Sequence, residues 1–123
     1  MELDIAGSKS NPKIHFSKEE NRVVIYGRSV LKNMDDTFFY PLFSFLKRYK
    51  EANEKGLTVE FYLDYFNTSS HPSLIKIFEL SGEIEDVKVS WLYDPNDMEM
   101  MEIGQELQIY SPVKFDIKLA EKV

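Results

Sequence analysis

The stretch VEFYLDYFNTSSHP, residues 59–72, decides the fold and contains the candidate site. Its first half is an aromatic and β-branched run with the composition of a buried strand. Its second half consists of small polar residues, after which apolar side chains recur at helical spacing as far as Phe78. The stretch therefore predicts a strand from Leu57 to Phe66 that leads directly into a helix ending near Ser81 and Gly82.

Upstream of this stretch, the sequence predicts a hairpin and one helix. Residues Lys13–Phe16 alternate polar and apolar side chains, and Arg22–Tyr26 are mostly β-branched or aromatic, with a polar turn between them. Leu3 and Ile5 allow a short edge strand beside this hairpin. From Phe38 to Tyr49, aromatic and aliphatic residues recur at the spacing of an amphipathic helix.

Downstream, the pattern continues as strand, helix and strand. Residues Val87–Tyr93 have the composition of a strand, and Asp94–Asp97 form a turn with capping residues. Residues Met98–Gln108 have helical periodicity, and Val113–Leu119 supply a last strand. The acidic, methionine-bearing part of this helix is either an ordinary amphipathic helix or a second adaptable interface.

The order of these elements indicates the fold class. Strands that alternate with helices favour right-handed crossovers and a mainly parallel sheet. We expect an α/β fold with one mixed, mainly parallel sheet of about five strands, an N-terminal antiparallel hairpin and three flanking helices. No repeat, low-complexity tract or composition shift marks a linker, so residues 1–123 are expected to form a single domain.

The composition excludes several classes of function. Cysteine is absent, which excludes disulfides, thiolate metal sites and a thiol nucleophile. The formal net charge of -6 repels phosphate backbones and anionic lipid, so neither nucleic acid nor a membrane is an expected partner. The N-terminus lacks the features of a signal peptide, and no apolar run approaches the roughly 20 residues that span a bilayer. We expect a cytoplasmic protein.

The sequence also lacks the usual motifs of a cofactor or metal site. The five glycines are scattered and form no phosphate-binding loop. The two histidines, His15 and His71, have no second histidine or carboxylate at a spacing typical of metal ligands. We therefore expect no catalytic residues, no metal and no cofactor.

The polar segment after the central strand is the candidate site. Asn67, Thr68, Ser69 and Ser70 stand at a helix N-terminus, where free N–H groups and the helix dipole accommodate a phosphoryl group on a hydroxyl side chain. The same residue types are preferred helix caps, which is an equally simple interpretation. A third interpretation is a small hydrolase that uses Thr68 or Ser70 with His71, although adjacency in sequence does not supply the geometry of such a pair.

Three segments resemble the SiaC family of bacterial regulatory phosphoproteins. The most specific is YLDYFNTSS, residues 62–70, and the other two are IYGRS at residues 25–29 and FYPL at residues 39–42. The resemblance covers nearly the whole chain and implies a single SiaC-like, STAS-like regulatory domain. One departure lies at Val30–Lys32, where the family often has proline and glutamate before the asparagine that is Asn33 here.

The resemblance implies a function as well as a fold. It implies that Thr68 is phosphorylated by a kinase with the histidine-kinase-like ATPase fold and dephosphorylated by a PP2C-type phosphatase. The unphosphorylated form is then expected to bind and activate a diguanylate cyclase, which promotes biofilm formation or aggregation through c-di-GMP. The alternative is an anti-sigma factor antagonist, whose main partner is an anti-sigma factor in a partner-switching pathway.

The residues of the expected switch have separate roles. Thr68 is the expected phosphoacceptor, and Asn67, Ser69 and Ser70 shape the loop. The helix from Pro72 to Leu80 is the expected contact surface. The expected partner-binding residues are Arg28, Asp64, His71 and Leu74.

Overall fold

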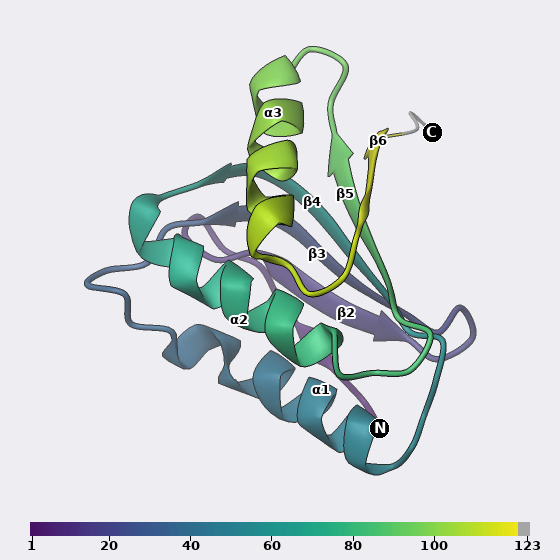
Figure 1. The fold of residues 1–123 in the computed structure, drawn as a ribbon. Coiled ribbons are helices and arrows are strands. Elements are labelled where there is room, and N and C mark those ends of the chain that lie inside the picture. The colour runs from purple at the N-terminus through teal and green to yellow at the C-terminus, as the bar shows by residue number, and fades with distance from the viewer. Residues whose placement is uncertain (121–123) are drawn as a thin grey trace.

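The computed structural model describes residues 1–120, and its centre is one six-stranded sheet with the strand order β1-β2-β3-β4-β5-β6 (Figure 1). The first three strands pair antiparallel, and β3 to β6 pair parallel. The strands are β1 (Asp4–Ile5), β2 (Lys13–Ser17), β3 (Arg22–Ser29), β4 (Thr58–Phe66), β5 (Lys88–Tyr93) and β6 (Asp116–Leu119).

Three α-helices connect the parallel strands, and short 3-10 turns precede or follow them. The first two helices lie side by side over the sheet (Figure 1). The third helix contacts the last two strands, β5 and β6. The α-helices are α1 (Tyr40–Glu51), α2 (His71–Ser81) and α3 (Met98–Leu107), and the 3-10 turns are η1 (Thr37–Phe39), η2 (Thr68–Ser70) and η3 (Gln108–Tyr110).

All three α-helices pack on the same face of the sheet. The ring of Phe61 on β4 lies 5.3 Å from that of Phe78 on α2 and 5.5 Å from that of Trp91 on β5. Trp91 in turn contacts α3, because its indole Nε1 donates a hydrogen bond of 3.0 Å to the carbonyl oxygen of Met100. The opposite face of the sheet is open and carries exposed residues such as Tyr62.

The predicted fold class is confirmed, and the differences concern element ends. The sheet has six strands rather than about five, because the chain before the hairpin adds the two-residue strand β1. Helix α1 begins at Tyr40 after a 3-10 turn, which places Pro41 in the first turn, where its missing N–H is tolerated. The last strand begins only at Asp116. Within residues 1–120, no helix is long and apolar enough to cross a membrane.

The carboxyl ends of β3 and β4 meet at one edge of the sheet, and a bulge there changes which side chains are exposed. Gly27 pairs with Leu63, but the next residue, Arg28, pairs with Tyr65, so Asp64 has no partner on β3. Gly27 has a φ of +113°, which L side chains rarely adopt. Because of this bulge, both Asp64 and Tyr65 are exposed instead of alternating across the sheet.

Candidate functional site

Residues 67–70, which we call the switch loop, join the carboxyl end of β4 to the start of α2. Thr68 is exposed, and its hydroxyl has no hydrogen-bond partner within residues 1–120. Ser70 N–H bonds to Asn67, whereas the N–H groups of Thr68 and Ser69 have no such partner in the same part of the chain. An exposed hydroxyl therefore sits beside free backbone donors at a helix N-terminus.

The side chain of Asn67 fixes the switch loop on both sides. Its Nδ2 donates to the carbonyl oxygen of Leu31 over 2.8 Å, and its Oδ1 accepts from the N–H of Leu31 over 3.2 Å. The same Oδ1 caps the helical segment by accepting from the N–H of Ser70 over 3.1 Å. One carboxamide thus ties the loop after β3 to the start of α2.

Ser70 anchors the end of the loop in the core. Its side chain is fully buried, and its Oγ lies 2.8 Å from Asn67 Oδ1, 3.0 Å from the carbonyl oxygen of Ser29 and 2.8 Å from Ser29 Oγ. A hydroxyl has one proton to donate, so Ser70 donates to one of the first two acceptors, and Ser29 Oγ can donate to it. Asn67 before Thr68 and Ser70 two residues after it are both fixed by hydrogen bonds, whereas the side chain of Thr68 is exposed.

The structure places two of the predicted contact residues on the exposed surface near the loop. The Arg28 guanidinium lies 5.4 Å from the centroid of the Tyr65 ring, which is a cation–π distance. Asp64 is exposed at the bulge beside them. Arg28 and Asp64 therefore bring one charge of each sign to the carboxyl edge of the sheet.

The other two predicted contact residues differ from each other. His71 is half-buried, and its ring packs edge-on against Tyr110 with 5.8 Å between centroids. Leu74 is fully buried in the core, so it is a packing residue and not part of a contact surface. The reason is that α2 turns Leu74 and Phe78 toward the sheet, and only residues such as Lys76 remain exposed.

The described residues do not form the nucleophile and base pair that a hydrolase needs. Ser70 Oγ is buried and bonds to Asn67 and Ser29, whereas the His71 ring faces Tyr110. The His71 backbone N–H donates to the carbonyl oxygen of Thr68, but within residues 1–120 no hydrogen bond joins the His71 ring to the hydroxyl of Thr68 or Ser70, although a nucleophile and its base need to meet at that distance. The same part of the chain holds no group of three or more side chains that could bind a metal ion.

A hollow beside His71 contains residues that the sequence pattern did not single out. It has a volume of about 450 Å³ and lies between the switch loop and the end of α3. Ile109 and Tyr110 in its wall are 81% and 59% exposed. The sequence signal that could have indicated this hollow is the pair of apolar residues Ile109 and Tyr110, which follow the predicted helix and precede Ser111.

Sequence comparison decides the family. A sequence model described as SiaC family regulatory phosphoprotein matches residues 5–120. The chain belongs to the SiaC family. This confirms the resemblance that was drawn from residues 62–70 and two other segments, and the match includes the whole switch loop.

This SiaC family member is similar to proteins of Pseudomonas aeruginosa. An uncharacterized protein of strain UCBPP-PA14 is 25% identical over 111 residues, which cover 87% of each chain. The solved structure of SiaC has a TM-score of 0.82 at 25% identity, over 98% of this chain and 99% of that one. A chain in the crystal structure of the diguanylate cyclase SiaD in complex with its activator SiaC has a TM-score of 0.85 at 24% identity, over 96% of this chain and 99% of that one.

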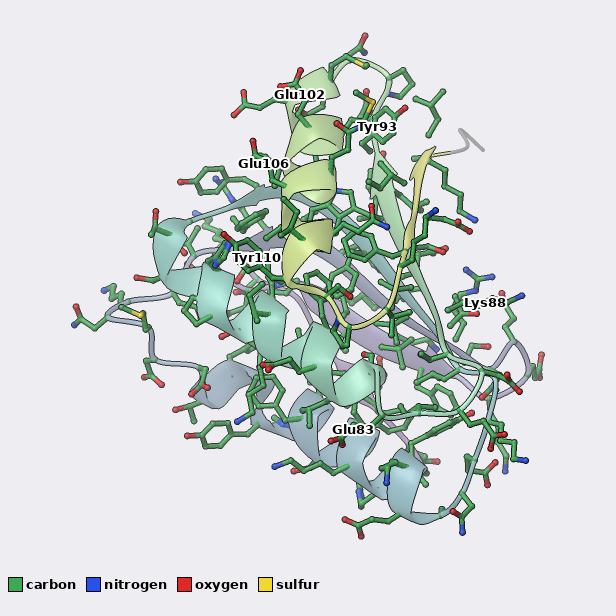
Figure 2. The ribbon with its side chains drawn as sticks, viewed as in Figure 1. Glu83, Lys88, Tyr93, Glu102, Glu106 and Tyr110 are labelled. Carbon is green, nitrogen blue, oxygen red and sulfur yellow. The ribbon has the colours of Figure 1, made fainter. Side chains whose placement is uncertain are left out.

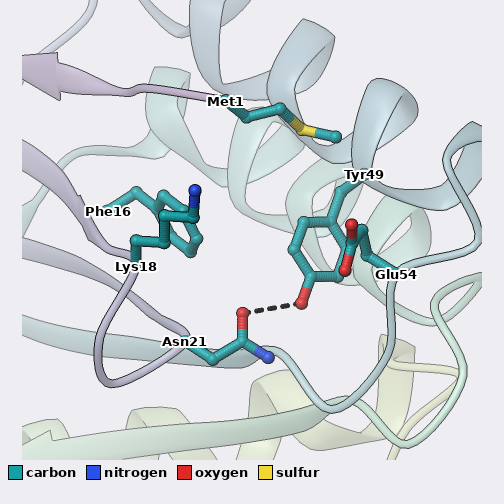
Figure 3. Close-up of a pocket in the computed structure, with 6 residues that line it drawn as sticks. All are labelled: Met1, Phe16, Lys18, Asn21, Tyr49 and Glu54. Atoms are coloured by element: carbon teal, nitrogen blue, oxygen red, sulfur yellow. Dashed lines mark hydrogen bonds between the residues drawn. The ribbon is translucent and has the colours of Figure 1, made fainter.

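The SiaC family chain has a further pocket at the opposite edge of the sheet (Figure 3). Its volume is about 340 Å³, and Phe16 and Tyr49 line it. The Tyr49 hydroxyl lies 2.7 Å from Asn21 Oδ1, to which it donates a hydrogen bond. Burial raises the pKa of Tyr49 above its ordinary value, an effect larger than the lowering by Asn21. This pocket lies at the amino ends of β3 and β4, away from Thr68.

Proposed function

We propose that this protein is a regulatory phosphoprotein, without catalytic activity of its own, that binds and activates a diguanylate cyclase in the cytoplasm when Thr68 is unphosphorylated. The observation that carries the proposal is the exposed Thr68 hydroxyl on a loop that Asn67 and Ser70 hold in place. Membership of the SiaC family supports the regulatory role. The solved complex of SiaD with its activator SiaC supports the choice of effector.

Phosphorylation of Thr68 acts through charge and solvation. A phosphoryl group adds about -1.5 to -2 charges and three acceptor oxygens. The free N–H groups of Thr68 and Ser69 and the N-terminus of α2 stabilise that charge while it faces water. An effector that covers the loop removes the water, and the buried phosphate then weakens the complex. A loss of about 3 kcal/mol lowers the affinity more than a hundredfold, which is enough for an off state.

The modifying enzymes are part of the proposal. The kinase has the histidine-kinase-like ATPase fold, and the phosphatase is of the PP2C type. The position of Thr68 supports both roles. Its side chain is exposed and its hydroxyl has no hydrogen-bond partner among residues 1–120, so both the kinase and the phosphatase can reach it. Ser69 is half-buried and Ser70 is fully buried, so neither competes well as acceptor.

The test measures modification and binding together. Wild type, Thr68→Ala and the matched control Ser69→Ala are incubated with ATP and the histidine-kinase-like ATPase encoded nearest to this chain, and intact masses are recorded. We expect one phosphate on wild type and on Ser69→Ala, and none on Thr68→Ala. The phosphorylated and unmodified proteins are then titrated with the neighbouring diguanylate cyclase, whose product formation is measured. Modification at another residue, or equal activation by both forms, contradicts the proposal.

A further inference from the structure

Strand β6 forms one edge of the sheet. It pairs in parallel with β5 on one side, and no strand of residues 1–120 pairs with its other side. Figure 2 shows Tyr93, at the carboxyl end of β5, next to the end of this edge strand. An edge of this kind presents main-chain N–H and C=O groups to which a further strand can bond.

The hydrogen bonds to β5 show which main-chain groups of β6 point outward. The N–H of Ala120 donates to the carbonyl oxygen of Tyr93 over 2.9 Å, so Ala120 faces β5. Successive residues of a strand direct their main-chain groups to opposite sides, and therefore Ile117 and Leu119 face the free edge. Leu119 is 52% exposed and Ile117 is half-buried, so both can meet a partner strand.

The open face of β6 carries one charge of each sign. Ile117 pairs with Trp91, which points toward the helices, so the side chains of Asp116 and Lys118 point to the opposite face. Both are exposed, and no ion pair joins either of them to another of residues 1–120. Lysines alone on an edge repel a second copy of that edge, whereas an aspartate and a lysine two residues apart complement one.

We propose that β6 pairs antiparallel with β6 of a second copy of this chain, about a two-fold axis through Ile117. In this register Asp116 lies opposite Lys118 of the partner subunit, and the symmetry repeats the pair. These are non-hydrogen-bonded pairs, because Asp116 and Lys118 direct their main-chain groups toward β5. The side chains of such pairs lie closer together, which strengthens the two ion pairs.

The other face of the paired strands is apolar. Ile117 lies opposite Ile117 of the partner subunit, and Leu119 lies opposite Phe115 of the partner subunit. These are the hydrogen-bonded pairs, because Ile117 and Leu119 direct their N–H and C=O groups to the free edge. The pairing therefore joins the two sheets into one and covers the exposed part of Leu119.

The dimer is weak and transient, and it leaves the switch loops free. Strand β6 has only four residues, and the net charge of -6 opposes association between copies. Because β4, β5 and β6 are parallel within one chain, an antiparallel contact at β6 directs the carboxyl ends of β4 in the two copies to opposite ends of the joined sheet. The inference is therefore independent of the proposed function.

Sedimentation equilibrium over a concentration series measures the association of the full chain. Wild type is compared with Asp116→Lys and Lys118→Asp, and the controls with the same charge changes are Glu83→Lys and Lys13→Asp. Glu83 follows α2 and lies away from β6 (Figure 2), and Lys13 is exposed on β2. Each edge variant places like charges opposite each other, so we expect it to dimerise about tenfold more weakly or worse. Both controls are expected to dimerise as wild type does.

An equimolar mixture of Asp116→Lys and Lys118→Asp tests the register. A mixed dimer again places opposite charges against each other at both pairs, so the mixture is expected to associate about as strongly as wild type, although neither variant does so alone. The double variant Asp116→Lys, Lys118→Asp complements itself and is expected to recover in the same way. Circular dichroism checks that each variant is folded.

A cross-link gives a second test of the register. The chain has no cysteine, so Asp116→Cys and Lys118→Cys each introduce a single thiol. The Cα atoms of a non-hydrogen-bonded pair lie about 4.5 Å apart, which is within the range of a disulfide. After mixing and oxidation, we therefore expect more of the disulfide between the two variants than of either variant with itself.

The outcomes decide the inference without the effector. If wild type stays monomeric up to about 1 mM, or if the two edge variants dimerise as strongly as wild type, the pairing of β6 is overturned. A mixture of the two edge variants that does not recover association overturns the antiparallel register. Edge variants that stay monomeric and still activate the cyclase leave the proposed function standing.

Discussion

At the scale of the residue, the Asn67 carboxamide connects two loops that are far apart in sequence. It pairs with both main-chain groups of Leu31 and caps the segment that leads into α2. Sequence alone indicated Asn67 as a capping residue, because that role is local and depends on residue type. The bonds to Leu31 span 36 residues and follow from the pairing of β3 with β4, which the local pattern does not encode.

We predict that Asn67→Ala lowers the free energy of unfolding by about 2 kcal/mol, because it removes a cap and leaves the half-buried Leu31 main-chain groups without partners. Asn67→Asp keeps the acceptor for Ser70 but loses the donor to Leu31, so a smaller loss of about 1 kcal/mol is expected. Urea denaturation measures both values. Thr68→Ala is the control and is expected to change the free energy of unfolding by less than about 0.5 kcal/mol, because its side chain is exposed. Equal stability of all three variants contradicts this role of Asn67.

At the scale of the element, α3 approaches the sheet through a residue without a side chain. A Cβ on Gly104 would lie 2.5 Å from Trp91 Cδ1 and 2.7 Å from Trp91 Nε1, both closer than real contacts allow. The helical periodicity predicted α3 to within a residue of its observed end, since periodicity reports the apolar face. It did not predict this close approach, which depends on how the helix sits on β5. The bulge at Asp64 escaped prediction for the same reason.

Gly104→Ala is therefore expected to destabilise the protein in spite of the better helix propensity of alanine. The methyl group overpacks against the indole at a cost of about 1–3 kcal/mol, which outweighs the gain of about 1 kcal/mol from propensity. Urea denaturation followed by fluorescence of Trp91, the one tryptophan, measures the change and reports the indole environment in the native state. Gln105→Ala on the exposed side of the same helix is the control, with a stability equal to wild type or slightly higher. A Gly104→Ala variant more stable than wild type would show that α3 moves freely.

At the scale of the whole molecule, the parallel sheet separates two polar clusters. The switch loop lies at the carboxyl end of β4, and the bonds among Asn21, Tyr49 and Lys55 lie at its amino end. Strand β4 has nine residues, which places the two clusters about 25 Å apart. The sequence predicted the strand from Leu57 to Phe66 but not the cluster at its amino end, because the bonds among Asn21, Tyr49 and Lys55 join residues that are far apart in sequence.

We predict that the two clusters contribute independently to stability and that only one of them acts in binding. Tyr49→Phe removes a half-buried hydrogen bond to Asn21 and is expected to cost about 1 kcal/mol. Because sites so far apart share no partners, the double variant Tyr49→Phe, Asn67→Ala is expected to lose the sum of the single losses to within about 0.5 kcal/mol. Urea denaturation of the four proteins gives this coupling, and cyclase titration is expected to leave the affinity of Tyr49→Phe unchanged. A coupling above about 1 kcal/mol, or a weaker complex with Tyr49→Phe, would mean that β4 transmits a change from its amino end to Thr68.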